Sequence, residues 1–218
     1  MAFELIPGFG EFFRRFPRMN VSPIKGESIT IRGEYNFSAR AVKSPEIIDS
    51  YRLEIHIPHD FPKTLPSVYE VDSKIPRNPE HHVNGDGTLC MGSPLRLRWK
   101  LAGKPTLIGF AEECLTPYLY GVSYKLEYGK FPFGELDHGR PGVIADYINL
   151  FGLKTGQQVE ETIKLISMKK RIANKQPCPC GCNKRLGSCS FHFIVNSFRK
   201  IAPRTWFGRH LQTMGTEK

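Results

Sequence analysis

The chain has 218 residues, 40% of them hydrophobic, which suits one ordinary domain with a short appendage. Its apolar runs are too short to cross a bilayer, and its N-terminus carries Glu4 and no basic segment, so we expect a cytoplasmic protein without a membrane partner. The net charge of +10 is uneven, since residues 1–151 contain 18 Lys and Arg against 18 Asp and Glu, whereas residues 152–218 contain 13 against 3.

The N-terminal half is predicted to form strands. Residues 27–37 and 50–58 alternate apolar and polar side chains, which indicates an antiparallel sheet with one buried face. Residues 60–71 contain two prolines, which favours a turn followed by a short or edge strand. Residues 76–87 then predict a long loop.

Beyond this loop the spacing of apolar residues becomes helical. Residues 106–118 predict a helix with Cys114 on its buried stripe, and residues 143–151 predict a second. Thr155-Gly156-Gln157-Gln158 fits a capping box that begins a third, and residues 191–198 predict a fourth. Strands followed by helices indicate the α+β class.

Cys90 has the neighbours of a reactive thiol. The stretch His81-His82-Val83-Asn84-Gly85-Asp86-Gly87-Thr88-Leu89-Cys90 places two imidazoles, a carboxamide and a glycine-rich turn before it. A nearby imidazole or polar turn can raise the fraction of thiolate, which is the nucleophile. We therefore predict a nucleophile at Cys90. The alternative is a small buried hydrophobe.

The order of these motifs resembles the ubiquitin-conjugating (UBC-like) enzyme family. The matching residues are the strand Tyr51 to Pro58, Asp60-Phe61-Pro62, Leu65-Pro66, His82-Val83-Asn84 and Gly87-Thr88-Leu89-Cys90. Val83 stands where the family has proline, and the spacing from His82 to Cys90 is shorter than in the eukaryotic enzymes. Gly134-Glu135-Leu136-Asp137-His138-Gly139, followed by Tyr147, is similar to the bacterial branch, in particular to stand-alone conjugating enzymes of CBASS anti-phage systems.

The resemblance implies a UBC-like sheet flanked by helices over residues 1–151, and thioester chemistry at Cys90. Cys90 would accept the C-terminal carboxyl of a protein, in the CBASS branch a cGAS/DncV-like nucleotidyltransferase, and pass it to a lysine of a protein. Asn84 matches the family's triplet, but His82 stands eight residues before Cys90, where the family's Asn stands. Either residue could donate a hydrogen bond to the oxyanion, or could only hold the loop through a structural hydrogen bond. His138 would orient and deprotonate the lysine, or cap a turn.

The C-terminal segment contains a metal-binding pattern. Cys178, Cys180, Cys189 and His192 form C-x-C-x8-C-x2-H, similar to the SEC-C type of zinc knuckle, and supply the four ligands of tetrahedral zinc. The usual fourth ligand follows the third directly, where this chain has Ser190, so Cys182 is an alternative to His192. We expect a structural zinc in an appendage with a C-terminal helix over residues 176–218, joined by a helical linker over residues 152–175.

Two classes of function fit the sequence. The first is a conjugating enzyme, which Cys90 within G-x-x-C favours. The chain has no glycine-rich phosphate-binding motif, so the carboxyl would be activated by a separate enzyme or in some other way. The second is a non-catalytic UBC-like binding module whose zinc-bearing tail binds nucleic acid through residues such as Lys169-Lys170-Arg171. A solvated basic helix gives the same charge pattern.

Overall fold

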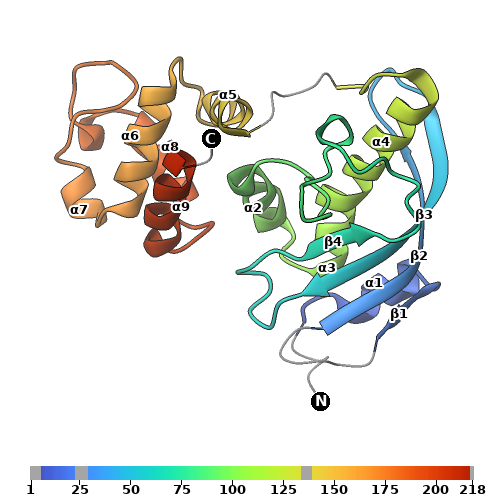
Figure 1. Cartoon of the computed structure of the whole chain (residues 1–218). Coiled ribbons are helices and arrows are strands. Elements are labelled where there is room, and N and C mark those ends of the chain that lie inside the picture. Colours follow the sequence, from blue (N-terminus) through green and yellow to red (C-terminus); the bar gives the residue numbers. More distant parts are fainter. Residues whose placement is uncertain (1–5, 23–28, 134–138, 217–218) are drawn as a thin grey trace. The chain divides into compact units, whose positions relative to one another are not determined.

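The structure is a computed structural model, and its described residues are 6–22, 29–133 and 139–216 (Figure 1). The chain forms two compact units. The first, here called the sheet unit, comprises Met1–Gly92 and Lys100–Glu135. The second, the helical unit, comprises Ser93–Trp99 and Leu136–Lys218. Helix α2 (Pro94–Gly103) therefore begins in the helical unit and ends in the sheet unit.

The sheet unit is built on an antiparallel meander of four strands within the described residues. In sheet order these are β1 (Met19–Val21), β2 (Ile29–Arg40), β3 (Glu46–Ile57) and β4 (Ser67–Glu70). Strands β2 and β3 pair along their whole length, and their inward side chains, including Ile31, Tyr35, Leu53 and Ile55, are fully buried. The alternation in the sequence thus predicted the central strand pair correctly, and β4 is the predicted edge strand.

Gly33 allows β1 to lie close to β2. It pairs with Met19, and a Cβ atom at Gly33 would lie 2.2 Å from the carbonyl oxygen of Arg18. Any side chain there would displace β1 from the sheet, so the position requires glycine.

Helices cover the buried face of the sheet. Helix α1 (Phe9–Arg15) packs against α3 (Leu107–Phe110), and α4 (Thr116–Tyr128) packs against β2 and β3, as Figure 1 shows. Two buried tyrosines of the sheet bind the long helix: the hydroxyl of Tyr35 is 2.7 Å from Thr116 Oγ1, and that of Tyr51 is 2.7 Å from Ser123 Oγ. These hydrogen bonds satisfy polar groups that the apolar layer would otherwise leave unpaired.

The helix predicted over residues 106–118 continues to Tyr128 through a π-helical turn, η3 (Ala111–Leu115). Pro117 follows this turn and has no N–H to donate to the carbonyl of Glu113. Lys100 Nζ donates to that carbonyl at 3.2 Å instead. The prediction that Cys114 is a core residue is confirmed, since it is 1% exposed and burial raises its pKa to about 11.

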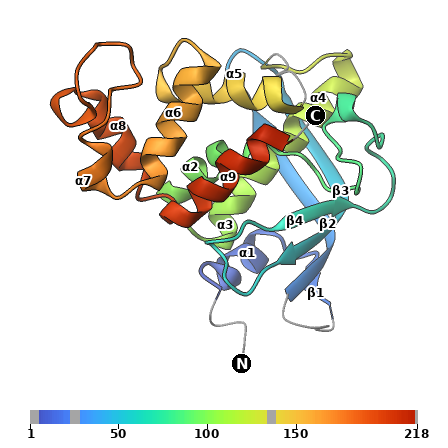
Figure 2. The ribbon, with the colours of Figure 1, turned by 60° about the vertical axis from the view of Figure 1, so that its left-hand side comes forward.

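The helical unit is a small bundle. Its further elements are α5 (Gly139–Phe151), α6 (Gly156–Ser167), α7 (Lys170–Ala173), η4 (Leu186–Ser188), α8 (Phe191–Phe198) and α9 (Arg204–Thr216), seen from a second side in Figure 2. Helix α6 contacts α5, α8 and α9. The predicted capping box is confirmed, because Thr155 Oγ1 accepts from the backbone N–H of Gln158 and the Gln158 side chain accepts from that of Thr155.

The observed units differ from the predicted division at residue 151 and from the predicted linker over residues 152–175. Val159, Ile163 and Ile166 on α6 are fully buried in one cluster with residues of α5, α8 and α9. The strongly amphipathic helix is therefore the centre of the bundle. Within the described part of the chain, the helices are too short or too polar to span a membrane.

Candidate active site and metal centre

Cys90 ends a small hairpin beside the edge strand β4. Val83 and Leu89 form an antiparallel bridge, and the backbone N–H of Leu89 donates to the carbonyl of Val68 on β4 at 2.8 Å. The backbone N–H of Cys90 donates to the carbonyl of His82 at 2.8 Å. Both ends of the hairpin are thus bonded, which places the thiol directly after a well-ordered turn.

Asn84 and Thr88 close the hairpin. The Asn84 backbone N–H donates to the Thr88 carbonyl at 2.9 Å, and Asn84 Nδ2 donates to Thr88 Oγ1 at 2.8 Å. Asp86 accepts from the Thr88 hydroxyl at 2.6 Å and from its N–H at 2.9 Å, and these bonds lower the pKa of Asp86. The carboxamide predicted as an oxyanion donor therefore holds the turn in this structure.

His82 contributes to the site through its backbone. It adopts a left-handed conformation with φ 54°, directly after the short 3₁₀-helix η2 (Pro79–His81). Its carbonyl accepts from Cys90, while its imidazole lies against Phe131, with ring centroids 5.1 Å apart. The strained conformation is uncommon for a residue other than glycine and is typical of functional loops.

Tyr118 is the residue of this site that the sequence did not identify. It lies on α4, is 8% exposed, and donates its hydroxyl to the carbonyl of His81 at 2.9 Å and of His82 at 3.4 Å. Burial raises the pKa of Tyr118, and the nearby Cys90 raises it further. In the sequence Tyr118 follows Pro117 at the end of a predicted apolar helix, which gave no signal for a role beside Cys90.

The half-buried Cys90 thiol has a raised pKa. Burial raises its pKa above the ordinary value, and a hydrogen bond from the backbone N–H of Gly92 lowers it in part. No cationic group among the described residues contributes to this pKa. The predicted effect of a neighbouring imidazole on the thiolate fraction stays a prediction. His138 lies outside the described residues, so its role stays a prediction.

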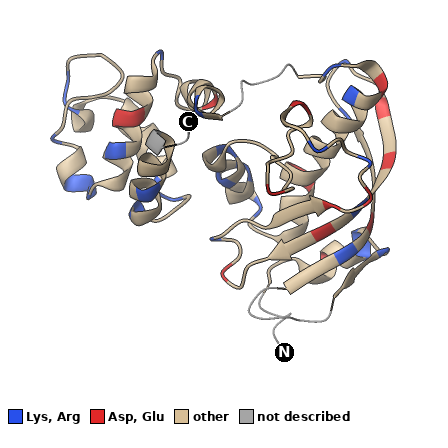
Figure 3. Ribbon diagram, viewed as in Figure 1, with Lys and Arg blue, Asp and Glu red and all other residues tan. Residues whose placement is uncertain are grey.

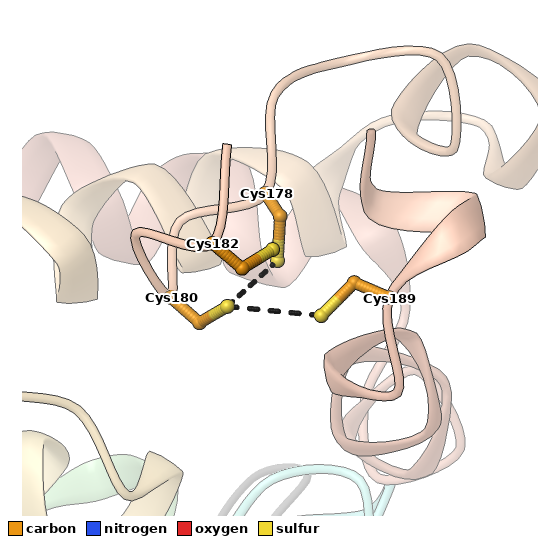
Figure 4. A group of neighbouring side chains, drawn as sticks. All are labelled: Cys178, Cys180, Cys182 and Cys189. Atoms are coloured by element: carbon orange, nitrogen blue, oxygen red, sulfur yellow. Dashed lines mark hydrogen bonds between the residues drawn. The ribbon is translucent and has the colours of Figure 1, made fainter. Parts of the chain in front are cut away.

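A second site is a cluster of four cysteines in the helical unit (Figure 4). The sulfur atoms of Cys178, Cys180, Cys182 and Cys189 all lie within 4.8 Å of one another. Cys178 Sγ is 3.3 Å and Cys189 Sγ 3.7 Å from Cys180 Sγ. Tetrahedral coordination with Zn–S bonds near 2.3 Å places sulfurs about 3.8 Å apart, so the cluster has the dimensions of a metal site.

A tight hairpin between α7 and η4 brings the first three sulfurs together. Pro177 bridges Arg185, and the backbone N–H of Cys178 donates to the carbonyl of Lys184 at 2.8 Å. Gly181, with φ 84°, makes the turn within the hairpin. Cys189 follows η4, whose Leu186 is fully buried in the bundle core.

The fourth thiol of the cluster is Cys182, the alternative to His192. His192 Nδ1 instead lies 2.7 Å from the carbonyl oxygen of Cys189, and its ring packs on Phe193 with centroids 4.0 Å apart. This differs from the ligand set predicted with His192. The physical reason is that His192 is already in the first turn of α8, where its side chain bonds back to the preceding backbone.

One thiol of the cluster is poised for metal binding. The backbone N–H of Phe191 donates to Cys189 Sγ at 3.5 Å and lowers the pKa of Cys189 to about 7. Burial raises the pKa of Cys178. Because a cation binds thiolates, an ion at this point would offset both the burial and the mutual repulsion of the sulfurs.

The sheet also has a polar groove of about 750 Å³. Its lining includes the cations Arg18, Arg32, Arg52 and Lys74 and the acids Glu34, Glu70 and Asp72. Arg18 pairs with Glu34 at 2.8 Å, so part of this charge is neutralised locally. The groove contains neither of the cysteine sites.

A scan against models of protein families found no family that matches the chain, and searches of curated proteins and of solved structures found no match. The chemistry of the two cysteine sites therefore carries the functional argument.

Proposed function

We propose that the chain is a UBC-like conjugating enzyme in which Cys90 carries the C-terminal carboxyl of a protein as a thioester and transfers it to a lysine amine. Three features support this: an antiparallel meander of four strands, a loop bearing Cys90 after its last strand, and helices that follow. They occur in the order that the resemblance implies.

The environment of the Cys90 thiol is the observation that carries the proposal. The thiol is half-buried, receives an N–H from Gly92, and has a raised pKa. A cysteine hydrolase needs a base that activates both the thiol and water, whereas a carrier must keep its acyl group until an amine arrives. A thiol of high pKa is a poorer leaving group, so its thioester is lost more slowly. The site thus favours a carrier.

The reaction needs an activated donor. The Cys90 thiol loses its proton and attacks the carbonyl carbon of an acyl adenylate or acyl thioester supplied by an activating enzyme, and the leaving group departs. The lysine amine then attacks the thioester carbonyl. The tetrahedral oxyanion collapses, the C–S bond breaks, the amine loses a proton, and an isopeptide bond remains.

The carried protein is proposed from the resemblance to the CBASS branch. It would be a cGAS/DncV-like nucleotidyltransferase bearing an accessible C-terminal carboxylate, and the acceptor would be a lysine of a protein. His82, Asn84 and His138 stay candidates for stabilising the oxyanion and activating the lysine. Of His82 and Asn84, Asn84 has the weaker support as the oxyanion donor, because its side chain already bonds to Thr88 within the turn.

The test uses the purified chain, the nucleotidyltransferase, an activating enzyme and Mg-ATP. The wild type should form an adduct that thiols release, and Cys90→Ser should form either a thiol-resistant ester or no adduct. Cys114→Ala is the matched control, because Cys114 is a buried core cysteine of the same unit. Full conjugation by Cys90→Ala, measured by intact-protein mass spectrometry, would refute the proposal.

We further propose that the four-cysteine cluster binds zinc as a structural ion. A closed set of four thiolates is the usual ligand set of structural zinc, and it leaves no position for a reacting group. Cys189 at the start of α8 and Cys178 in the hairpin would be joined through the ion. Zinc would thereby hold the hairpin on the bundle core.

A second candidate function is nucleic-acid binding by the helical unit. Its described residues carry 15 Lys and Arg against 3 Asp and Glu, and Figure 3 shows blue segments on α6, α7 and α9. Helix α7 places Lys170 and Arg171 one after the other, directly beyond Lys169. Such a surface binds phosphates through counterion release, without reading sequence.

This candidate is tested by replacing the three cations around α7 with alanine (Lys169, Lys170 and Arg171) and titrating a labelled 20-base-pair duplex at several salt concentrations. The matched control replaces three exposed cations of the sheet unit (Lys43, Arg77 and Lys130). The α7 variant should lower the slope of log affinity against log salt by roughly 2 to 3, since each phosphate contact contributes about 0.9. An equal effect of both variants, or no binding by the wild type at low salt, would contradict it.

A further inference from the structure

One face of helix α4 binds the backbone that precedes the Cys90 hairpin. Tyr118 and Lys125 are seven residues apart, about two turns, so they lie on the same side of the helix. Tyr118 donates its hydroxyl to the carbonyls of His81 and His82, and Lys125 Nζ donates to the carbonyl of Glu80 at 2.8 Å. This face of α4 therefore binds three successive carbonyl groups of the chain.

Phe131 packs between the same face and the loop. It lies just beyond the C-terminal end of α4, and its half-buried ring rests on Gly121, where a Cβ atom would be only 3.2 Å from Phe131 Cδ1. The ring contacts the His82 imidazole, with centroids 5.1 Å apart. Lys125 Nζ lies 4.6 Å from the centroid of the same ring. One aromatic side chain thus joins the helix, the loop and an ammonium group.

His82 connects Phe131 to Cys90. Its backbone carbonyl accepts from the N–H of Cys90 at 2.8 Å, and its φ is 54°. This left-handed conformation is unfavourable for a residue other than glycine, so it persists only where neighbouring contacts hold it. Phe131 supplies such a contact at the side chain, and Tyr118 supplies one at the carbonyl. All of these residues belong to the sheet unit.

We propose that Phe131 is a positioning residue for Cys90 and that Lys125 supports it. The ring keeps His82 in its left-handed conformation, and the His82 carbonyl keeps the Cys90 backbone in place. This inference rests on the proposed function, in which the Cys90 sulfur attacks an acyl donor. Such an attack needs a fixed sulfur, because a displacement of about 1 Å lowers rates by up to about 100-fold.

The first experiment measures the hydrogen bond between Cys90 and His82 directly. Exchange of the Cys90 amide hydrogen is followed by NMR in a chain labelled at its cysteine nitrogens, and Cys90→Ser identifies the signal. Wild type is compared with Phe131→Leu, which removes the ring, and with Phe131→Tyr, which retains it. The matched control is Phe133→Leu, because Phe133 is 63% exposed and its ring lies 6.0 Å from that of Tyr120.

We expect exchange of the Cys90 amide to be about tenfold faster in Phe131→Leu, since this variant loses an aromatic contact and a cation–π contact. Phe131→Tyr and Phe133→Leu should exchange at the wild-type rate. A folded Phe131→Leu protein in which Cys90 exchanges no faster than in Phe133→Leu would overturn the inference.

Lys125→Gln keeps the proposal testable if Phe131→Leu does not fold. It removes the ammonium group over the ring and the bond to the Glu80 carbonyl, and should speed exchange of the Cys90 amide by about threefold. Lys130→Gln is its control, because it removes the same charge at an exposed position nearby. Equal exchange rates in the two variants would then count against the positioning role.

The second readout is a single turnover of thioester formation with the nucleotidyltransferase, the activating enzyme and Mg-ATP. Phe131→Leu should lower the rate constant at saturating donor by about tenfold and leave the donor concentration for half-maximal rate unchanged. Phe131→Tyr should restore the rate constant. Partial unfolding would instead lower the yield of thioester without changing its rate constant, so it is distinguishable from a displaced thiol.

The two readouts separate the positioning role from the function. If the wild type forms no thioester while exchange in Phe131→Leu is faster, the function is refuted and the role of Phe131 in holding the loop stands. If Phe131→Leu forms the thioester with the wild-type rate constant, the positioning role is refuted and the function stands.

Discussion

The hydroxyl of Tyr118 donates to the carbonyl of His81 at 2.9 Å, which ties helix α4 to the loop before Cys90. The same hydroxyl lies 3.4 Å from the carbonyl of His82, and that carbonyl accepts the Cys90 N–H. A single buried side chain thus supports the backbone that carries the reactive thiol. The long helix contributes to the site through this contact.

Replacing Tyr118 with phenylalanine should lower both stability and Cys90 reactivity. The change leaves the His81 carbonyl without its buried donor, which should reduce the free energy of unfolding by about 1 kcal/mol. Urea unfolding measures this loss, and iodoacetamide labelling measures Cys90. Tyr124→Phe, at a half-buried position of the same helix, should behave as wild type. Equal effects of the two variants would argue against the role of the hydroxyl.

Zinc binding should depend on Cys182 and be independent of His192. The Cys182 sulfur belongs to the cluster, whereas the His192 imidazole bonds to the Cys189 carbonyl. We expect about one zinc ion per chain in wild type and in His192→Gln, and loss of tightly bound zinc in Cys182→Ser. Metal analysis after dialysis against a weak chelator decides this. Retention by Cys182→Ser with loss in His192→Gln would restore the set predicted from the sequence.

The stability of the helical unit should fall in acid through His210. Burial and the nearby Arg98 lower the pKa of His210 to about 4, and its ring stacks on Trp206 at 4.7 Å. Since the folded pKa is below the unfolded value, this contribution is complete above about pH 6.5 and is lost as the pH falls toward 4. It amounts to about 3 kcal/mol at most.

The His210 contribution is measured as the difference between wild type and His210→Gln in urea unfolding at pH 7.5, 6.0, 5.0 and 4.0. The difference cancels the protonation of other groups, including the cysteine cluster. If the free energies of unfolding of wild type and His210→Gln change with pH in parallel, His210 is not the source of the acid sensitivity.

Alanine at Gly33 should destabilise the sheet unit strongly. Its Cβ would lie 2.2 Å from the Arg18 carbonyl oxygen, so β1 must move away, at a cost of about 3 kcal/mol. Gly10→Ala is the control, because a Cβ at this position of α1 meets no atom within 4 Å and alanine favours helix by up to about 1 kcal/mol. The midpoint of thermal unfolding should fall in Gly33→Ala and rise in Gly10→Ala. An unchanged midpoint in Gly33→Ala would show that β1 is displaced at little cost.

The sequence by itself determined the local elements. Alternation predicted β2 and β3, the Thr155–Gln158 capping box predicted the start of α6, and the spacing of three cysteines and His192 predicted a metal site in this segment, because each depends on residues close together in the chain. Helix α2 was not predicted, since Leu95, Leu97 and Trp99 alternate and give no helical period.

The tertiary structure decided which distant groups meet. It placed Cys182 and not His192 with the other sulfurs, Tyr118 beneath the His81–His82 backbone, and Asp146 at the start of α2. The burial that raises the pKa of Cys90 likewise depends on how the loop packs. The contacts of Tyr118 and Asp146 join residues 37 and 53 positions apart. Their geometry follows from how whole helices pack, and the periodicity of a single segment carries no information about that packing.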